Sequence, residues 1–214
     1  MLPKVTQAIR SHSLEQGFTL MEALVAIVVI AIALAVIAPP ILLAAATRVQ
    51  NQRVEQATQL AQGEIDRIRL LVERGQYQAT NLPPVSTPTS IQNTAAPNGI
   101  NNNTATRTAA QGFSIDINRD GTNDFVVQTF REQGQQVNST PVAFRMGVRV
   151  YSAQAFANNA YPSRTDPLRI GLTSSVNVQS PLAVLYAPIV RGDRDFSLCA
   201  YRRFTLNDSS ASCP

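Results

Sequence analysis

The pattern of apolar and polar positions divides the chain into segments with different periods. Residues 1–17 are polar and mildly basic, and residues 18–46 form an apolar run in which Glu22 is the only charged side chain. Residues 47–77 repeat apolar side chains every three or four positions, whereas residues 78–112 show no apolar period. Residues 113–214 contain stretches that alternate between apolar and polar. The pattern predicts helix over 18–46 and 47–77, an exposed and partly disordered loop over 78–112 and β-strands beyond it.

The apolar run is long enough to cross a membrane. From Phe18 to Ala38 it would extend about 31 Å as a helix, which matches the thickness of a hydrocarbon core. Pro39 and Pro40 follow, and each lacks a backbone donor and clashes with the preceding helical turn, so we expect a kink or local melting there. The alternative is a plain single-pass anchor whose end is marked by the prolines.

Residues 47–77 have the pattern of an amphipathic helix. Asp66 and Arg69 are spaced to pair along its polar side, and Gly75 suits a C-terminal cap. We expect the apolar stripe to pack on the chain's own C-terminal domain. The stripe consists of Val54, Ala57, Ala61, Ile65, Ile68 and Val72.

The clearest strand pattern lies at residues 142–151, where Val142, Phe144, Met146, Val148 and Val150 alternate with other residues. A shorter alternation begins at residue 113. An antiparallel sheet covered on one face by the amphipathic helix explains both periods, which predicts an α+β fold. The weaker strand candidates are Asp124–Phe130, Leu168–Val178, Leu182–Tyr186 and Phe196–Thr205.

The composition argues against common kinds of catalysis. The sole histidine is His12, within residues 1–17, so a chain from which that segment had been removed would lack Ser-His and Cys-His nucleophile systems. Catalysis by a pair of carboxylates stays formally open. The formal net charge of +4 is small and the charged residues are scattered along the chain, which does not indicate a nucleic-acid-binding protein. We therefore predict a protein that is not an enzyme.

The leader differs from an ordinary secretory signal. Lys4 and Arg10 precede the apolar run, and positive charge at this position keeps the N-terminus in the cytoplasm. Secretory signals are usually cut after their apolar region. Here the apolar region follows Gly17, so a cut between Gly17 and Phe18 would leave the apolar helix on the mature protein.

The sequence around this position resembles the signal of type IV prepilins and type II secretion pseudopilins. The resemblance is carried by Gly17-Phe18-Thr19-Leu20-Met21-Glu22 in front of an unbroken apolar run. It implies a pilin-like fold, in which a long N-terminal helix packs on an antiparallel β-sheet head. It also implies that Gly17 is the last leader residue, that Phe18 becomes a methylated N-terminus, and that Glu22 acts in assembly. Pro39 matches a kink position of the family, and Pro40 is an additional proline.

These implications lead to a functional hypothesis. We expect a minor type IV pilin, anchored in the inner membrane by one helix, with an extracytoplasmic head, and then incorporated into a filament. The implied partners are a prepilin peptidase, other pilin or pseudopilin subunits, the inner-membrane assembly platform and, before assembly, membrane lipid. The alternatives are a type II secretion pseudopilin and a static membrane-anchored calcium-dependent binding protein.

A loop over residues 116–124 predicts a calcium site. Side-chain oxygens at alternate positions followed by a glycine match the first half of an EF-hand-type loop. The expected ligands are the side chains of Asp116, Asn118, Asp120 and Asp124 and the carbonyl of Thr122. The twelfth position is Val127 instead of glutamate, so the loop is not an EF-hand. The alternative is a plain Asp-Gly hairpin turn.

Two further features lie near the C-terminus. Cys199 and Cys213 form an even pair, which in an exported domain predicts one disulfide, with two free thiols as the alternative. Their spacing also resembles the disulfide-bounded region of many pilins. Arg202 and Arg203 stand between aromatic residues, a combination that contacts DNA in some proteins, although such a pair more often forms a solvated strand face.

Overall fold

The computed structural model describes residues 19–75, 77–87, 90–137, 139–168, 178–192 and 196–206. The chain divides into two compact units, Met1–Val49 and Gln50–Pro214, which are described separately below. Helix α1 (Leu20–Glu73) contributes to both units.

In the first unit, helix α1 exposes apolar side chains throughout. The helical assignment continues through Pro39 and Pro40. The two prolines leave the carbonyls of Ala35 and Val36 without the usual donor four residues on. The kink and the local melting predicted at this position stay predictions.

In the second unit, one stripe of α1 packs on a β-sheet. The predicted stripe is buried at Ala57, Ala61, Ile65, Ile68 and Val72. The helix ends at Glu73, four residues before the predicted boundary. Gly75 explains the early end, because it has a left-handed φ of 70° and donates its N–H to the carbonyl of Val72 (3.1 Å).

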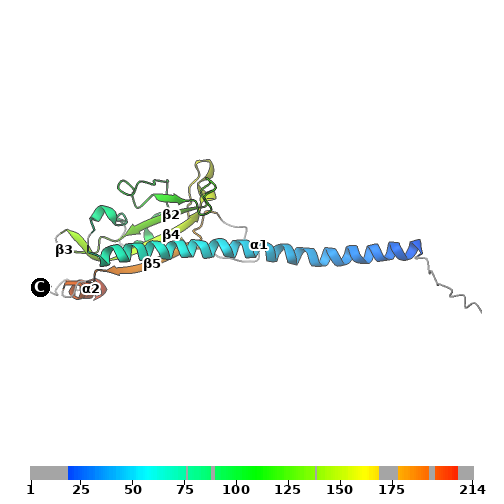
Figure 1. Cartoon of the computed structure of the whole chain (residues 1–214), viewed down its shortest axis with the longest axis horizontal. Helices are drawn as coiled ribbons and strands as arrows, with labels where there is room; N and C mark the ends of the chain where they lie inside the picture. Colours follow the sequence, from blue (N-terminus) through cyan, green and yellow to red (C-terminus); the bar gives the residue numbers. More distant parts are fainter. Residues whose placement is uncertain are drawn as a thin grey trace, which may run out of the picture. The chain divides into compact units, whose positions relative to one another are not determined.

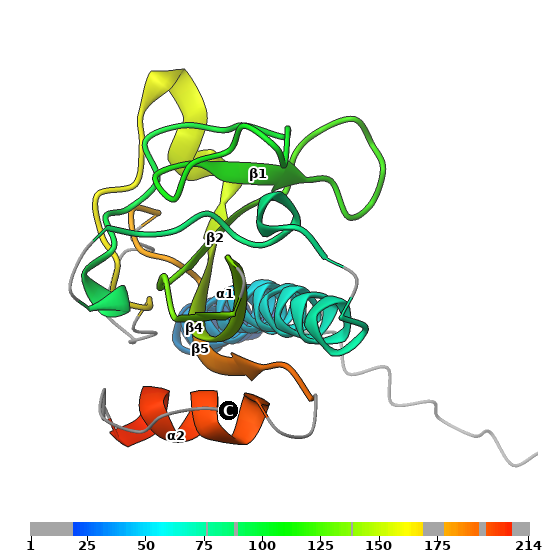
Figure 2. The same ribbon diagram turned by 90° about the vertical axis from the view of Figure 1, so that its left-hand side faces the viewer.

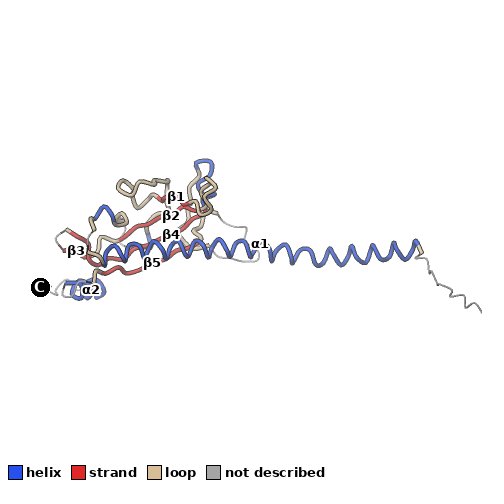
Figure 3. The backbone as a smooth tube through the Cα atoms, viewed as in Figure 1, coloured by secondary structure: helices blue, strands red, loops and turns tan. Residues whose placement is uncertain are grey.

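The sheet has five antiparallel strands (Figure 3). The chain order is β1 (Gly112–Ile115), β2 (Phe125–Arg131), β3 (Gln135–Val137), β4 (Thr140–Ser152) and β5 (Ala183–Val190). Long strand β4 is central, because it pairs with β2, β3 and β5. The predicted strands near residues 113, 124–130, 142–151 and 182–186 are therefore confirmed. Most of the candidate Leu168–Val178, residues 169–177, lies outside the described residues.

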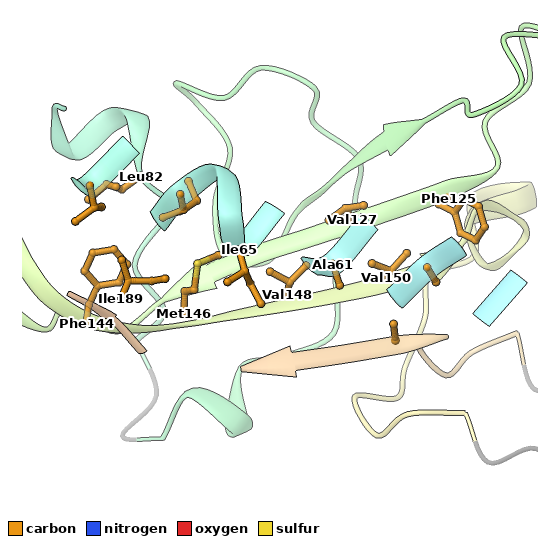
Figure 4. Packing of buried hydrophobic residues seen from close by; sticks show 14 of the residues in the cluster. Ala61, Ile65, Leu82, Phe125, Val127, Phe144, Met146, Val148, Val150 and Ile189 are labelled. Atoms are coloured by element: carbon orange, nitrogen blue, oxygen red, sulfur yellow. The ribbon is translucent and has the colours of Figure 1, made fainter. Parts of the chain in front are cut away.

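The main core lies between α1 and the sheet. Figure 1 shows the C-terminal part of α1 running along β4 and β5. Ala61 and Ile65 of the helix belong to the same buried cluster as Met146, Val148 and Val150 of β4, as Figure 4 shows. The α+β architecture predicted from the two periods is thus confirmed.

The other face of the sheet is also buried, which the sequence did not predict. Residues 78–112 contain two short 3-10 helices, η1 (Ala79–Asn81) and η2 (Ile91–Asn93). Arg149 on β4 is 0% exposed and donates to the carbonyl oxygens of Thr94 (2.6 Å) and Gln92 (2.8 Å). Gln128, its register partner on β2, donates to the Ala95 carbonyl (2.9 Å). Polar side chains of the sheet therefore hold this segment by its backbone.

A second arginine stabilises the same cover from within it. Arg107 is buried, and its guanidinium lies 4.4 Å from the ring centroid of Phe113 on β1. Burial lowers the pKa of Arg107, and the charge of Glu64 partly offsets this effect. The segment predicted as an exposed, partly disordered loop is thus mostly a structured layer on the sheet.

The candidate strand Phe196–Thr205 is a helix, so that prediction is wrong. Helix α2 (Phe196–Leu206) lies across β5 from α1 in Figure 2. Phe204 packs on the small cluster that includes Val142 and Ala143. The short alternation that suggested a strand also fits a helix, because residues 196, 200 and 204 are four apart. Leucine, alanine and arginine have high helix propensity and favour the helical alternative.

Candidate functional site: the N-terminal helix and the hairpin loop of the head

Helix α1 begins with a capping residue that the sequence interpretation missed. Thr19 precedes the first helical residue, and its Oγ1 accepts a hydrogen bond from the backbone N–H of Glu22 (3.3 Å). The Thr19 carbonyl accepts from Ala23 N–H (3.1 Å). These are the bonds of an N-cap, and Thr19-x-x-Glu22 has the spacing of a capping box. The threonine followed three residues later by glutamate was the available signal.

Glu22 lies in the first turn of α1 and is exposed. The free N–H groups at a helix start attract negative charge, so this carboxylate is favourably placed for the isolated helix. None of the salt bridges among the described residues includes Glu22. Gly17 and Phe18, the predicted processing residues, lie outside the described residues. The pairing of Glu22 with the Phe18 amine therefore stays a prediction.

The residues around Glu22 form an extended apolar surface. Leu20 is 84% exposed, Met21 72% and Val25 57%, and the exposure continues past the prolines. The helix is long and apolar enough to cross a membrane, by length and composition. It fits a single-pass anchor near the N-terminus.

Comparison with known proteins gives one match. A family model described as the prokaryotic N-terminal methylation motif matches residues 12–38. It covers Gly17, Phe18, Glu22 and the start of α1, and it leaves the head unmatched. No curated protein and no solved structure matches the chain.

The matched motif, the apolar helix and the antiparallel sheet together support a pilin- or pseudopilin-type protein. More particularly, the motif supports membership of the type IV pilin and pseudopilin family. Proteins of this family are structural subunits and are generally not enzymes. Its leader implies processing by a prepilin peptidase and assembly with other pilins.

The predicted calcium loop connects β1 to β2 as a hairpin. Asp116 accepts from the backbone N–H of Arg119 (2.6 Å) and of Gly121 (2.9 Å). Asp120 accepts from Thr122 N–H (2.7 Å). Arg119 and Gly121 have positive φ values of 59° and 86°. The carboxylates thus stabilise a tight turn by accepting hydrogen bonds from backbone N–H groups of the same loop.

The remaining predicted ligands are used in a similar way. Asn118 donates from its side-chain amide to Asp120 (2.8 Å), and Asp124 accepts from Ile117 N–H (2.9 Å). The Thr122 and Asn118 hydrogen bonds lower the pKa of the Asp120 carboxyl. The described residues contain no cluster of three or more acidic, histidine or cysteine side chains arranged to hold a metal. Calcium binding stays a prediction.

Three of the C-terminal candidates, Cys199, Arg202 and Arg203, lie on α2. Cys199 lies within this helix, whereas Cys213 lies outside the described residues, so the disulfide stays a prediction. Arg202 is exposed and Arg203 is half-buried. The pair therefore belongs to a helix surface instead of the expected strand face. DNA contact at this position also stays a prediction.

A cleft of about 430 Å³ opens between α1 and the β1 end of the sheet. Its lining includes Gln59, Leu60, Gly63, Glu64 and Ile117. Glu64 is the one ionisable residue among the described residues that line the cleft, and it forms a salt bridge with a nearby arginine of α1 (2.9 Å). This lining offers apolar and amide contacts but no acid–base pair for catalysis.

Proposed function

We propose that this chain is a minor subunit of a type IV pilus, which supports pilus assembly, motility, adhesion or DNA uptake. The observation that carries the proposal is the methylation motif at residues 12–38, whose described residues lie on the capped and exposed apolar part of α1. The continuation Leu24-Val25-Ala26 and the long insert over residues 78–112 favour a minor subunit over a bulk one.

The proposed sequence of events begins in the inner membrane. The prepilin peptidase cuts between Gly17 and Phe18, and the new amine of Phe18 is methylated. The assembly platform then moves the apolar segment from lipid into the core of a filament. Within that core Glu22 pairs with the Phe18 amine of a neighbouring subunit, because two opposite charges are tolerated together in an apolar environment where one alone is not.

Mass spectrometry of the mature N-terminus tests the processing step. We expect a chain that begins with methylated Phe18. A Gly17→Val variant, which puts a branched side chain at the cleavage position, should keep its leader. A wild-type protein that retains residues 1–17 and stays in the membrane fraction would contradict the proposal and favour a static anchored protein.

The role of Glu22 is tested by its incorporation into sheared filaments. Glu22→Ala should still be cleaved but should be incorporated poorly. Glu55→Ala removes an exposed carboxylate from the same helix, outside the apolar run, and serves as the matched control. Equal incorporation of the Glu22 and Glu55 variants would refute the pairing with Phe18.

A type II secretion pseudopilin is the second candidate, since the same motif supports it. Deletion of the gene that encodes this chain distinguishes the pilus subunit from the secretion pseudopilin. Loss of surface fibres with normal protein secretion supports the pilus, and loss of secretion with normal fibres supports the pseudopilus.

We also propose that loop 116–124 binds calcium. Its oxygen atoms have the chemistry that Ca²⁺ prefers, provided that Asp116 and Asp120 give up the hydrogen bonds that they accept from backbone N–H groups of the loop. Calorimetric titration of the full-length protein with Ca²⁺ should show binding that Asp120→Ala weakens, with Mg²⁺ as the control ion. Equal heats for wild type and variant would remove the proposal.

A further inference from the structure

We infer that Asn98 is a site of spontaneous deamidation, at which the backbone nitrogen of Gly99 attacks the Asn98 side chain. The inference rests on the head alone and does not depend on the proposed function. It concerns a covalent change in the segment that lies along the outer edge of strand β1.

The local sequence and its surroundings favour the attack. Asn98-Gly99 is the one Asn-Gly pair in the sequence, and glycine has no Cβ to keep its nitrogen from the preceding side chain. Asn98 is exposed. A Cβ built on Gly99 would meet no atom within 4 Å, so the space beside the peptide is open.

The nucleophile is also free. Gly99 accepts a hydrogen bond at its carbonyl from Gly112 N–H (3.0 Å). Its own N–H donates no hydrogen bond to any described residue. The nitrogen can therefore turn towards the Asn98 side chain without breaking an existing bond.

The reaction balances with water as the co-reactant. The Gly99 nitrogen forms a bond to Asn98 Cγ, the bond from Cγ to the amide nitrogen breaks, and ammonia leaves with the proton from Gly99. The product is a five-membered succinimide. Water then opens one of its two carbonyls, which gives either aspartate or isoaspartate at position 98.

A second dipeptide in the head provides an internal comparison. Asp120-Gly121 can form the same succinimide by losing water, but Gly121 donates its N–H to Asp116 Oδ2 (2.9 Å). Asp120 also accepts hydrogen bonds that favour its ionised carboxylate, which is a poor electrophile. The fold therefore protects Asp120-Gly121 and leaves Asn98-Gly99 reactive.

Isoaspartate would disturb a defined contact. Asn98 N–H donates to Ala110 O (2.9 Å), Gly112 N–H to Gly99 O (3.0 Å) and Asn101 N–H to Gly112 O (2.7 Å). Two of these bonds join the segment to Gly112, the first residue of β1. Isoaspartate adds a methylene to the main chain between the first two bonds, so all three cannot keep their register. The change would uncover a strand edge, which is a site for pairing with another chain.

The test is incubation of the full-length protein at mildly alkaline pH, followed by proteolysis and mass spectrometry. We expect Asn98 to convert several-fold faster than any other asparagine, to both aspartate and isoaspartate. Gly99→Ala should slow the conversion several-fold, and Asn98→Gln should abolish it. In denaturant, isoaspartate should appear at Asp120 as well, because the protecting hydrogen bond is lost.

Two results would overturn the inference. One is an Asn98 that converts no faster than the other asparagines in the folded protein. The other is an equal rate in wild type and Gly99→Ala, with circular dichroism showing that both are folded. Hydrogen exchange tests the consequence: the amides of Asn101 and Gly112, which donate two of these bonds, should exchange faster in the aged protein. Unchanged exchange at both would refute the loss of register.

Discussion

Arg149 offers a direct test of the idea that the sheet holds its second cover through polar side chains. Its guanidinium donates to the carbonyls of Thr94 and Gln92, and to Tyr186 Oη (3.2 Å). It also lies 4.8 Å from the ring centroid of Phe130. Arg149→Met keeps an extended side chain but removes every donor, so the substitution isolates the polar contribution.

The expected loss of stability follows from these contacts. The buried Thr94 carbonyl left without a donor costs about 1–3 kcal/mol, and the Gln92 carbonyl, on an exposed residue, costs less. The lost contact with the aromatic ring costs about 1–2 kcal/mol. Relief from burying a charge offsets part of the sum. We expect the free energy of unfolding to fall by about 2–4 kcal/mol, which lowers Tm by roughly 4–16 °C in a domain of this size.

The assay is denaturant unfolding of the full-length protein, combined with limited proteolysis of residues 90–111. Arg145→Met is the matched control, because Arg145 lies on the same strand but its side chain is 44% exposed, and its contact with Glu132 is long (3.8 Å). That variant should lose less than about 1 kcal/mol. Equal unfolding and equal cleavage of the two variants would refute the role of Arg149.

Four other outcomes are expected. Gly147→Ala should lower the free energy of unfolding by about 1–3 kcal/mol, because the new Cβ would lie 2.5 Å from a ring carbon of buried Phe130. Gly63→Ala, whose Cβ meets nothing within 4 Å, should instead stabilise α1 by about 0.5–1 kcal/mol, and denaturant unfolding compares the two. The lowered pKa of Asp120 means that its contribution to stability is complete above the ordinary carboxyl pKa and is lost as pH falls through the lower folded value; NMR titration of the loop amides should show this midpoint, and Asp120→Asn should abolish it. Pro40→Ala should slow hydrogen exchange in the turn over residues 36–40 of α1, since it restores one backbone donor and removes a clash of about 3 kcal/mol, and unchanged exchange would contradict a weakened helix there.

Local patterns explain which parts of the fold were predictable. The stripe from Ala57 to Val72 and the alternation in β4 each repeat with one period, and each period belongs to one kind of element. The N-terminal motif was predictable for the same reason, because its residues are contiguous. The apolar helix that continues from Leu24 could likewise be predicted without knowledge of tertiary contacts.

The second face of the sheet was not predictable in this way. Arg149 occupies a position of β4 that a one-sided sheet would expose, and arginine is seldom fully buried. Its burial depends on carbonyls that lie more than fifty residues earlier in a segment without apolar period. Neither half of this contact carries a signal without the other. The same limit applies to α2, where a short run of residues fits either period.

The cap at Thr19 changes how Glu22 should be understood. From sequence, an acid at the start of an apolar run suggested a charge that needs a partner. In the structure Glu22 occupies the third helical position, where its N–H is bonded to Thr19 and its carboxylate is favoured by the helix start. The isolated helix therefore has a use for Glu22 without any second subunit.

A need for a partner arises when water leaves the first turn, because an unpaired carboxylate in an apolar surrounding costs several kcal/mol. Glu22→Gln, which keeps the side-chain length and an acceptor oxygen, should thus preserve the helix and cleavage while reducing incorporation. Normal incorporation of this variant would assign Glu22 to the cap alone.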